Sequence, residues 1–406
     1  TTEIYTLSLH DALPIYHLLE REVVLMKNGM RCLFFILIFM LAIPASYAEE
    51  SQKVLELDTK SAVLMDAQSG ELLYSQAPKE HLQIASVTKV MTMLLIMEAI
   101  DTGRISFDET VTASEYACSM GGSQVFLEAG EQMSVSDMLK AIAVASGNDA
   151  SVAMAEHILG SVPAFVNAMN ARAKAIGMND TQFVNCTGLD GENQYSCAYD
   201  VALMSRELLK HEKIKPYLSI WMDNLRNGEF GLANTNKLIR FYDGAIGIKT
   251  GSTEAAKYCL SAAATRNDLT LIAVVLASPN SATRFGNATK LLDYGFASYS
   301  MAKGASAGDS FGMLRVSKGE KCEVEVVAEK DLKKLVLKDK KGKVEVSTII
   351  PEYVIAPVSE KEKVGELILK IDGQQVEKIN LVAKSSVQRI KVWSLFVNML
   401  KIWTMA

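Results

Sequence analysis

The chain has 406 residues, 49% of them hydrophobic, so it is long enough to form two domains that each have a core. Its formal net charge of -5 at pH 7 provides no overall basic field, which argues against nucleic acid as a partner. We find no zinc-type spacing of Cys and His, no glycine loop typical of phosphate binding and no internal repeat.

The amino end is predicted to be removed from the folded protein. A short basic start at residues 26–31 precedes the apolar run "CLFFILIFMLAIPASYA", in which Ser46 and Ala48 occupy the small positions of a signal-peptidase site. We predict a signal peptide over 26–48 and an exported product. An uncleaved membrane anchor is the alternative, although the run is short for a span. Residues 1–25 are interpreted as a non-native extension, because "YTLSLHDALPI" resembles translated sequencing adapter.

The hydrophobic pattern becomes globular from about residue 53. Two short apolar strands flank a polar turn at 66–70, and the strands are followed by regions of helical periodicity. The predicted helices are 86–101, 134–146, 149–160, 164–177 and 198–210. A strand at 244–251, a hairpin at 257–278 and a helix at 287–300 complete the region. Helices followed by antiparallel strands and a closing helix predict an α+β domain over 53–302.

The composition changes after the small-residue segment "KGASAGDS" at 303–310. Residues 311–383 alternate Lys, Glu and Val with a period of two, and they contain turn signals at Lys341-Gly342 and Asp372-Gly373. The pattern predicts a small all-β domain. Because this segment has no His and no convergent polar cluster, we expect a spacer or a binding platform.

The tail, residues 386–406, has a third character. If it is helical, Lys391, Ser394, Asn398 and Lys401 form a narrow polar stripe, and apolar and aromatic residues fill the rest of the circumference. A wide apolar face with basic residues is typical of a helix that lies in a membrane surface. We therefore predict a membrane-anchoring helix. A terminal helix that packs on its own protein is the alternative.

One short stretch carries a chemical signal. In "QIASVTKVMTMLLIME", Ser86 and Lys89 are three residues apart, so they share one face of a helix. Lysine acts as a base only when neutral, and its ordinary pKa is about 10.4. The surrounding methionines and leucines supply the desolvation that disfavours the charged form, which makes Ser86 a candidate nucleophile and Lys89 its base.

Two further triplets have matching chemistry. Ser146, Gly147 and Asn148 lie at the junction of two predicted helices, where a turn can direct their side chains into a cleft. Lys249, Thr250 and Gly251 follow on a strand. Lys249 and Thr250 offer a cation and a hydroxyl for an anionic end of a substrate. Gly251 has no Cβ, so we expect it to let a substrate backbone approach the strand.

The three triplets, in this order, are typical of β-lactamases and penicillin-binding proteins. The whole chain after residue 48 resembles a low-molecular-mass penicillin-binding protein, a serine-type D-alanyl-D-alanine carboxypeptidase. The sporulation-associated branch in Gram-positive spore formers is the most similar. "MGGSQVFLEAGE", "SGNDASVAMAEHILGS", "KTGSTEAAKYCLSAAATR" and "TKLLDYGFASY" resemble that family as well. The resemblance implies a β-lactamase/transpeptidase-like domain followed by the β domain and the tail.

The resemblance also implies roles for single residues. Ser86 attacks the carbonyl of the penultimate D-Ala, Lys89 accepts its proton, and Ser146 relays protons. Substrate-binding roles fall on Asn148, Lys249, Thr250, Gly251, Ser252 and Arg284. Backbone N–H groups of Ser86 and Ser252 form an oxyanion hole. The implied partners are a peptidoglycan stem ending in D-Ala-D-Ala, β-lactams as covalent inhibitors, and a membrane surface. No metal or cofactor is implied.

Departures and rival functions stay open at this point. Gln194 stands where relatives often carry His, and Cys186 and Cys197 replace commoner residues; a Cys186–Cys197 bridge is conceivable, but no disulfide is predicted. A β-lactamase needs a carboxylate for deacylation, and Asp190 and Glu192 lack the expected spacing. A D,D-endopeptidase that cleaves wall cross-links uses the same triplets. A non-catalytic wall-binding or sensor protein is the third alternative.

Overall fold

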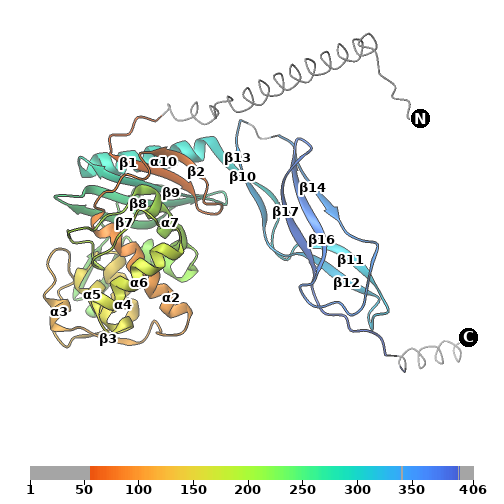
Figure 1. Ribbon diagram of the computed structural model, residues 1–406, viewed down its shortest axis with the longest axis horizontal. Coiled ribbons are helices and arrows are strands. Elements are labelled where there is room, and N and C mark those ends of the chain that lie inside the picture. The colour runs from red at the N-terminus through yellow and green to blue at the C-terminus, as the bar shows by residue number, and fades with distance from the viewer. Residues whose placement is uncertain (1–54, 340–341, 392, 394–406) are drawn as a thin grey trace, which may run out of the picture. The chain divides into compact units, whose positions relative to one another are not determined.

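The computed structural model describes residues 55–339, 342–391 and 393 (Figure 1). The predicted extension at 1–25, the signal peptide and most of the predicted anchoring helix lie outside the described residues. Among the described residues, no single helix has the length and hydropathy of a membrane span. Helices α5 (Asn148–Leu159) and α6 (Val162–Ala175) meet that test only as a pair, which is bent by 86°.

A five-stranded antiparallel sheet is the frame of the first domain, with strand order β2-β1-β9-β8-β7. Its strands are β1 (Ser61–Asp66), β2 (Leu72–Gln76), β7 (Ala245–Thr253), β8 (Lys257–Arg266) and β9 (Leu269–Ser278). The predicted strand pair, strand and hairpin are therefore confirmed. β7 lies at one edge of the sheet, with Lys249 opposite Ser261 and Gly251 opposite Cys259 on β8.

Both faces of this sheet are buried, because alternate residues of its strands point to opposite sides. Along β1, Val63 and Met65 join the larger core with the helical region, whereas Ala62 and Leu64 join a second core with the last helix. That helix, α10 (Ser281–Ser298), covers one face, and most of the other helices lie on the opposite side (Figure 1). The helices on that side include α2 (Lys89–Asp101), α4 (Val135–Ala143), α5, α6 and α7 (Ala198–Leu209).

Helix α10 begins earlier than predicted, at Ser281 rather than at 287. Asn280 is its N-cap, and the Asn280 side chain accepts a hydrogen bond of 2.8 Å from the backbone N–H of Thr283. The first turns of the helix are polar, so hydrophobic periodicity did not reveal them. Consequently Arg284 lies within the helix, on the side that packs against the sheet.

The small elements between the main helices and strands position loops around the sheet. They are the 3-10 helices η1 (Ala85–Thr88), η2 (Glu212–Ile214) and η3 (Arg226–Gly228), the short helices α3 (Glu115–Cys118), α8 (Lys215–Leu218) and α9 (Leu238–Phe241), and the hairpins β3 (Thr110–Thr112)–β4 (Gln132–Ser134) and β5 (Met222–Leu225)–β6 (Phe230–Ala233).

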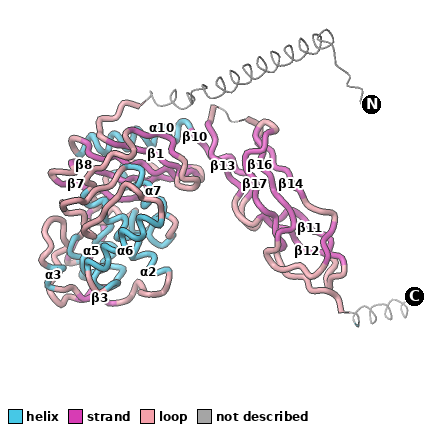
Figure 2. The backbone as a smooth tube through the Cα atoms, in the orientation of Figure 1, coloured by secondary structure: helices cyan, strands magenta, loops and turns pink. Residues whose placement is uncertain are grey.

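The carboxyl-terminal domain consists of strands and loops, and Figure 2 draws its described residues up to 391 in the colours of strand and loop. A six-stranded sheet has the order β14-β16-β17-β12-β11-β15. Its strands are β11 (Ser310–Ser317), β12 (Glu323–Ala328), β14 (Val344–Ile349), β15 (Tyr353–Ile355), β16 (Lys363–Ile371) and β17 (Gln374–Ala383). The predicted all-β character and the turn at Asp372-Gly373 are confirmed.

The boundaries of this domain extend beyond 311–383 at both ends. β10 (Tyr299–Ala305) pairs with β13 (Leu332–Leu337), so part of the predicted joint is strand. At the other end, Val387 forms a bridge with Val358, and Arg389 forms one with Gly319. The first residues of the predicted anchoring segment, 386–406, therefore pair with the β domain.

Candidate active site

Ser86 and Lys89 lie where η1 passes into α2. Ser86 is in the 3-10 turn, Lys89 is the first residue of the α-helix, and Lys89 Nζ is 3.0 Å from Ser86 Oγ. Lys89 is completely buried. Its amine also donates to Asn148 Oδ1 and to the backbone oxygen of Thr187, each at 2.6 Å. The predicted pairing of hydroxyl and amine is thus present, with two further acceptors around the nitrogen.

The environment of Lys89 favours the neutral amine. Desolvation by burial holds the pKa of Lys89 well below its ordinary value, and the positive charge of Lys249 lowers this pKa further. The carbonyl and amide oxygens that contact the nitrogen carry no formal charge. An amine whose neutral form is favoured in this way and that lies 3.0 Å from a serine hydroxyl can accept the proton of that hydroxyl.

Ser146 and Asn148 occupy the turn between α4 and α5, as predicted. Ser146 has a left-handed backbone with φ of 64°, and its buried Oγ makes no hydrogen bond with the described residues. Asn148 begins α5, and its Nδ2 donates to the carbonyl of Gly121 at 2.6 Å. Both ends of the Asn148 amide are therefore occupied within the protein, where they link Lys89 to the loop at 119–131.

Asp149 has a structural role that the sequence motifs did not indicate. Its buried carboxylate accepts hydrogen bonds from the backbone N–H groups of Val125 at 3.0 Å and Leu127 at 3.1 Å. These bonds tie the loop at 119–131 to the start of α5, where a negative charge is also favoured by the helix dipole. The "Gly-Asn-Asp" sequence thus fixes one wall of the site through two adjacent side chains.

Gly251 brings β7 against the nucleophile turn. A Cβ at this position would lie 2.6 Å from the carbonyl oxygen of Ile84 and 2.9 Å from the backbone nitrogen of Ser86. The space that glycine leaves is therefore filled by η1. The prediction that this space admits a substrate backbone was wrong in its physical reason. Glycine is required here so that the strand and the Ser86 turn can pack together.

Lys249 and Thr250 are buried on β7, with exposed fractions of 1% and 6%. Desolvation, together with the nearby charge of Arg284, lowers the pKa of Lys249 to about 7. Lys249 Nζ donates to the backbone oxygen of Thr250 at 3.1 Å, and Ser252 follows as an exposed residue of the same strand. The positive charge of Lys249 lowers the pKa of Lys89, so the two amines lie near each other in the site.

Arg284 contacts the strands from α10. Its Nη1 donates to the carbonyls of Gly251 and Cys259, both at 3.2 Å, and its guanidinium lies 4.6 Å from the ring centroid of Phe285. The side chain is only 6% exposed. Arg284 was predicted to lie near the carboxylate pocket with a substrate-binding role, which stays a prediction; its contacts support β7 and add positive charge beside Lys249.

The loop at 185–194 forms another wall. Gly188 has φ of 84°, and a Cβ there would overlap the carbonyl of Ala85, so the loop lies directly on the nucleophile turn. Gln194 holds the loop, since its Oε1 accepts from the N–H groups of Val184 and Asn185 at 3.2 Å. Asp190 accepts a hydrogen bond of 2.7 Å from Thr253 Oγ1 at the end of β7.

The cysteines of the described chain are free: Cys118, Cys186, Cys197, Cys259 and Cys322. The conceivable bridge between Cys186 and Cys197 is therefore not formed. Burial raises the pKa of each of these two thiols to about 12, so both stay protonated at neutral pH.

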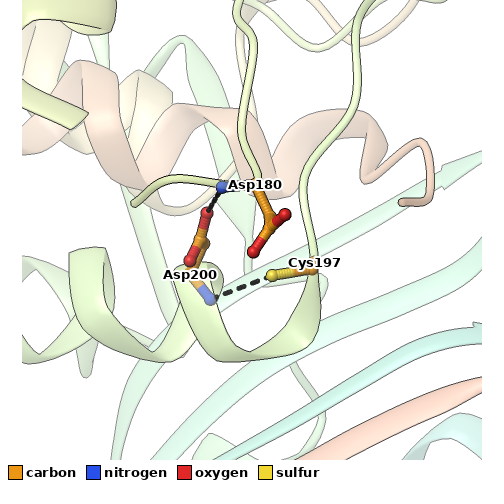
Figure 3. A group of neighbouring side chains, drawn as sticks. All are labelled: Asp180, Cys197 and Asp200. Carbon is orange, nitrogen blue, oxygen red and sulfur yellow. Dashed lines mark hydrogen bonds between the residues drawn. The ribbon is translucent and has the colours of Figure 1, made fainter. Parts of the chain in front are cut away.

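Asp180, Cys197 and Asp200 place possible metal-binding atoms within 4.8 Å of one another (Figure 3). Cys197 Sγ accepts a hydrogen bond from the N–H of Asp200 at 3.5 Å, as an N-cap of α7 does. Asp200 Oδ2 in turn accepts from the N–H of Asp180 at 2.8 Å and from Thr181 Oγ1 at 2.7 Å. These contacts attach the start of α7 to the turn at 180–181, and we assign them no metal.

Comparisons with known proteins agree with this geometry. The family model described as "D-alanyl-D-alanine carboxypeptidase" (Peptidase S11) matches residues 47–280, and the model described as "Penicillin-binding protein 5, C-terminal domain" matches residues 299–389. The predicted α+β penicillin-binding fold with an all-β second domain is thus confirmed.

Individual relatives cover both domains. The chain is 39% identical over 386 residues to D-alanyl-D-alanine carboxypeptidase DacF of Bacillus subtilis (strain 168), covering 93% of this chain and 99% of the relative. It is 31% identical to DacC of Escherichia coli (strain K12), covering 86% of this chain and 90% of the relative. The solved structure of penicillin binding protein 5 from Haemophilus influenzae is 32% identical, with a TM-score of 0.67 over 82% of this chain and 99% of that one. The chain therefore belongs to the Peptidase S11 family of D-alanyl-D-alanine carboxypeptidases.

Proposed function

We propose that this enzyme releases the terminal D-Ala of peptidoglycan stem peptides with Ser86 as the nucleophile and Lys89 as its base. The observation that carries this assignment is the buried Lys89 amine, 3.0 Å from Ser86 Oγ. The family to which the chain belongs supplies the reaction class, a serine hydrolysis through an acyl-enzyme. Penicillin acylates the same serine, as in the penicillin-binding proteins that the chain resembles.

The contacts of Lys89 support its role as a base. A neutral amine has two N–H groups and one lone pair. Thr187 O and Asn148 Oδ1 are acceptors at 2.6 Å, so they take both hydrogens. The lone pair is then left for the third neighbour, the hydroxyl of Ser86. The two oxygens thereby orient the nitrogen so that its basic side faces the nucleophile.

Acylation follows from this arrangement. As Ser86 Oγ attacks the carbonyl carbon of the penultimate D-Ala, Lys89 takes the hydroxyl proton. The oxyanion is stabilised by the N–H groups of Ser86 and Ser252, and Gly251 allows β7 to lie against the Ser86 turn. When the C–N bond breaks, the proton passes to the nitrogen of the leaving D-Ala, with Ser146 Oγ as the relay. Water then attacks the acyl carbon and restores the Ser86 hydroxyl.

The other end of the substrate is an anion. We assign the terminal carboxylate to Lys249 and Thr250, because an anionic ligand there stabilises the protonated form of Lys249, whose pKa is lowered to about 7 without it. A β-lactam that carries a carboxylate would use the same pair. Arg284 donates a hydrogen bond to the carbonyl of Gly251 and so supports the strand that carries this pair.

The test measures the release of D-Ala from a purified pentapeptide by mass spectrometry. Ser86→Ala should abolish both this release and labelling by penicillin. Lys89→Ala should slow acylation by roughly 10²–10⁴-fold, the range for loss of a general base. Near wild-type acylation by the Lys89 variant would refute the assignment of the base. Labelling without any D-Ala release would favour a sensor or wall-binding role.

We also propose that the mature enzyme begins after residue 48, is exported, and works at the outer face of the cytoplasmic membrane, where its substrate lies. The sequence of the tail supports attachment to the membrane surface: on a helix, Lys391 and Lys401 would share a narrow polar stripe opposite an apolar face with aromatics. The catalytic domain corresponds to 53–302 and the β domain to 311–383, extended by the strands and bridges described above.

A further inference from the structure

A second hydroxyl lies against Thr250. Oγ1 of Thr235 is 2.5 Å from Oγ1 of Thr250, a contact between residues 15 positions apart. Thr250 is 6% exposed, whereas Thr235 is exposed to solvent. The sequence motifs did not identify Thr235, which lies in the segment between β6 and α9. The pair thus connects a buried hydroxyl of the site with an accessible one.

The residues on either side of Thr235 fix its position. Asn236 Nδ2 donates to the carbonyl of Gly247 on β7 at 3.0 Å, and Asn234 Nδ2 donates to the carbonyl of Ile220 at 2.8 Å. Both asparagines are buried, with exposed fractions of 1% and 7%. The "Asn-Thr-Asn" sequence is therefore a short clamp that holds the Thr235 hydroxyl against the strand.

The direction of this hydrogen bond follows from the charge of the ligand. A hydroxyl has one hydrogen, so Thr250 cannot donate both to Thr235 and to a carboxylate. With an anion beside Thr250, repulsion between oxygens is relieved when the Thr250 hydrogen points at the anion. Thr250 Oγ1 then accepts the hydrogen of Thr235. Such chains of hydrogen bonds strengthen one another, and bonds to a charged acceptor are the strongest.

We propose that Thr235 is a positioning residue for the terminal carboxylate of the substrate: it donates to Thr250 and so turns the Thr250 hydroxyl toward that anion. The inference rests on the proposed function, in which Thr250 binds the carboxylate. It adds Thr235, a residue outside the three motifs that acts through Thr250.

The experiment compares Thr235→Val, Thr250→Val and the double variant, with kcat and KM measured on a peptide ending in D-Ala-D-Ala. Thr235→Val should lower kcat/KM about tenfold, mainly through KM, the size expected for one hydrogen bond. Thr235→Ser should restore it. Because Thr235 acts through Thr250, the double variant should be no worse than Thr250→Val. Multiplicative losses, or no loss in Thr235→Val, would overturn the proposal.

Thr265→Val is the matched control. Thr265 Oγ1 lies 2.9 Å from Thr270 Oγ1, so this variant breaks a threonine pair at the β8–β9 hairpin of the same sheet. It should leave kcat/KM unchanged. Acylation by benzylpenicillin, which carries a carboxylate, is measured on the same variants. If wild type is acylated but releases no D-Ala, the proposed function fails, and the acylation rates still decide the role of Thr235.

Discussion

At the scale of single residues, the site depends on two lysines whose pKa values are both lowered, mainly by burial. Lys89 must be neutral to act as a base, and burial supplies most of the effect, with Lys249 adding to it. Lys249 serves best as a cation, and its pKa of about 7 leaves it dependent on an anionic ligand. One amine is thus kept ready to accept a proton and the other is ready to bind an anion.

The charge of Lys249 can be tested through the pH dependence of acylation by penicillin. The rate should rise with pH as Lys89 loses its proton, with a midpoint well below the ordinary lysine pKa of about 10.4. Lys249→Gln removes a positive neighbour, so the pKa of Lys89 rises and the acid limb moves to higher pH. Lys249→Arg keeps the charge and should leave the limb in place. An unchanged midpoint in Lys249→Gln would contradict the coupling.

Sequence reasoning succeeded for Ser86 and Lys89 because a local turn brings them together, whatever the rest of the fold does. It could not identify Thr187, whose contribution is a backbone oxygen, or Thr235, which reaches Thr250 through a loop. Nor could it separate a cation that contacts the ligand from one that supports a strand, as for Arg284. Backbone contacts and long-range pairs leave no pattern in residue type.

At the scale of elements, β7 and η1 form one unit, since Gly251 lets the strand touch the nucleophile turn. The sequence predicted both elements, but not their contact. The start of α10 was predicted six residues too far along the chain for a similar reason. Its first turns carry a cap and a buried Arg284 instead of an apolar stripe. Element interiors were predictable from periodicity, and their ends depended on single capping residues.

Gly251→Ala tests the contact between β7 and η1. The added Cβ would force the strand away from the nitrogen of Ser86, 2.9 Å from it, and so misplace the oxyanion donors. The rate of acylation should fall by roughly 10²-fold, as for loss of one such donor. The free energy of unfolding should fall by about 1–3 kcal/mol, as for overpacking. Penicillin labelling and thermal denaturation measure the two effects.

Gly286→Ala is the control, since this exposed helical glycine has nothing within 4 Å of an added Cβ. It should leave acylation unchanged and stabilise the protein by about 0.5–1 kcal/mol, the usual gain of Ala over Gly in a helix. If Gly251→Ala acylates as fast as this control, the strand does not need to approach the turn.

At the scale of the whole molecule, the β domain and the tail extend a catalytic domain that already holds the proposed site residues. Val387 is buried and bridges Val358, and the N–H of Ile390 donates to the carbonyl of Lys318 at 2.9 Å. The part of the tail that could leave the β domain without breaking these contacts therefore starts after Lys391.

Two truncations separate anchoring from folding. A protein that ends at Lys391 should keep its D-Ala release but lose sedimentation with anionic lipid vesicles, because Lys401 and the apolar residues that follow Lys391 are gone. A protein that ends at Ser385 should also lose thermal stability, since it lacks the bridge of Val387. Full vesicle binding by the Lys391 truncation would show that the membrane contact lies elsewhere.

The position of β7 at the rim of its sheet has a consequence for selectivity. A peptide that lies along such a rim is recognised mainly through its main chain, which is the same in every sequence. Discrimination must then come from the chain end, where a free carboxyl group and the handedness of the last two residues are presented. A change confined to the terminus, such as an ester oxygen in place of the final amide nitrogen, would therefore alter only the recognition of the chain end. The rest of the peptide would still bind to this protein.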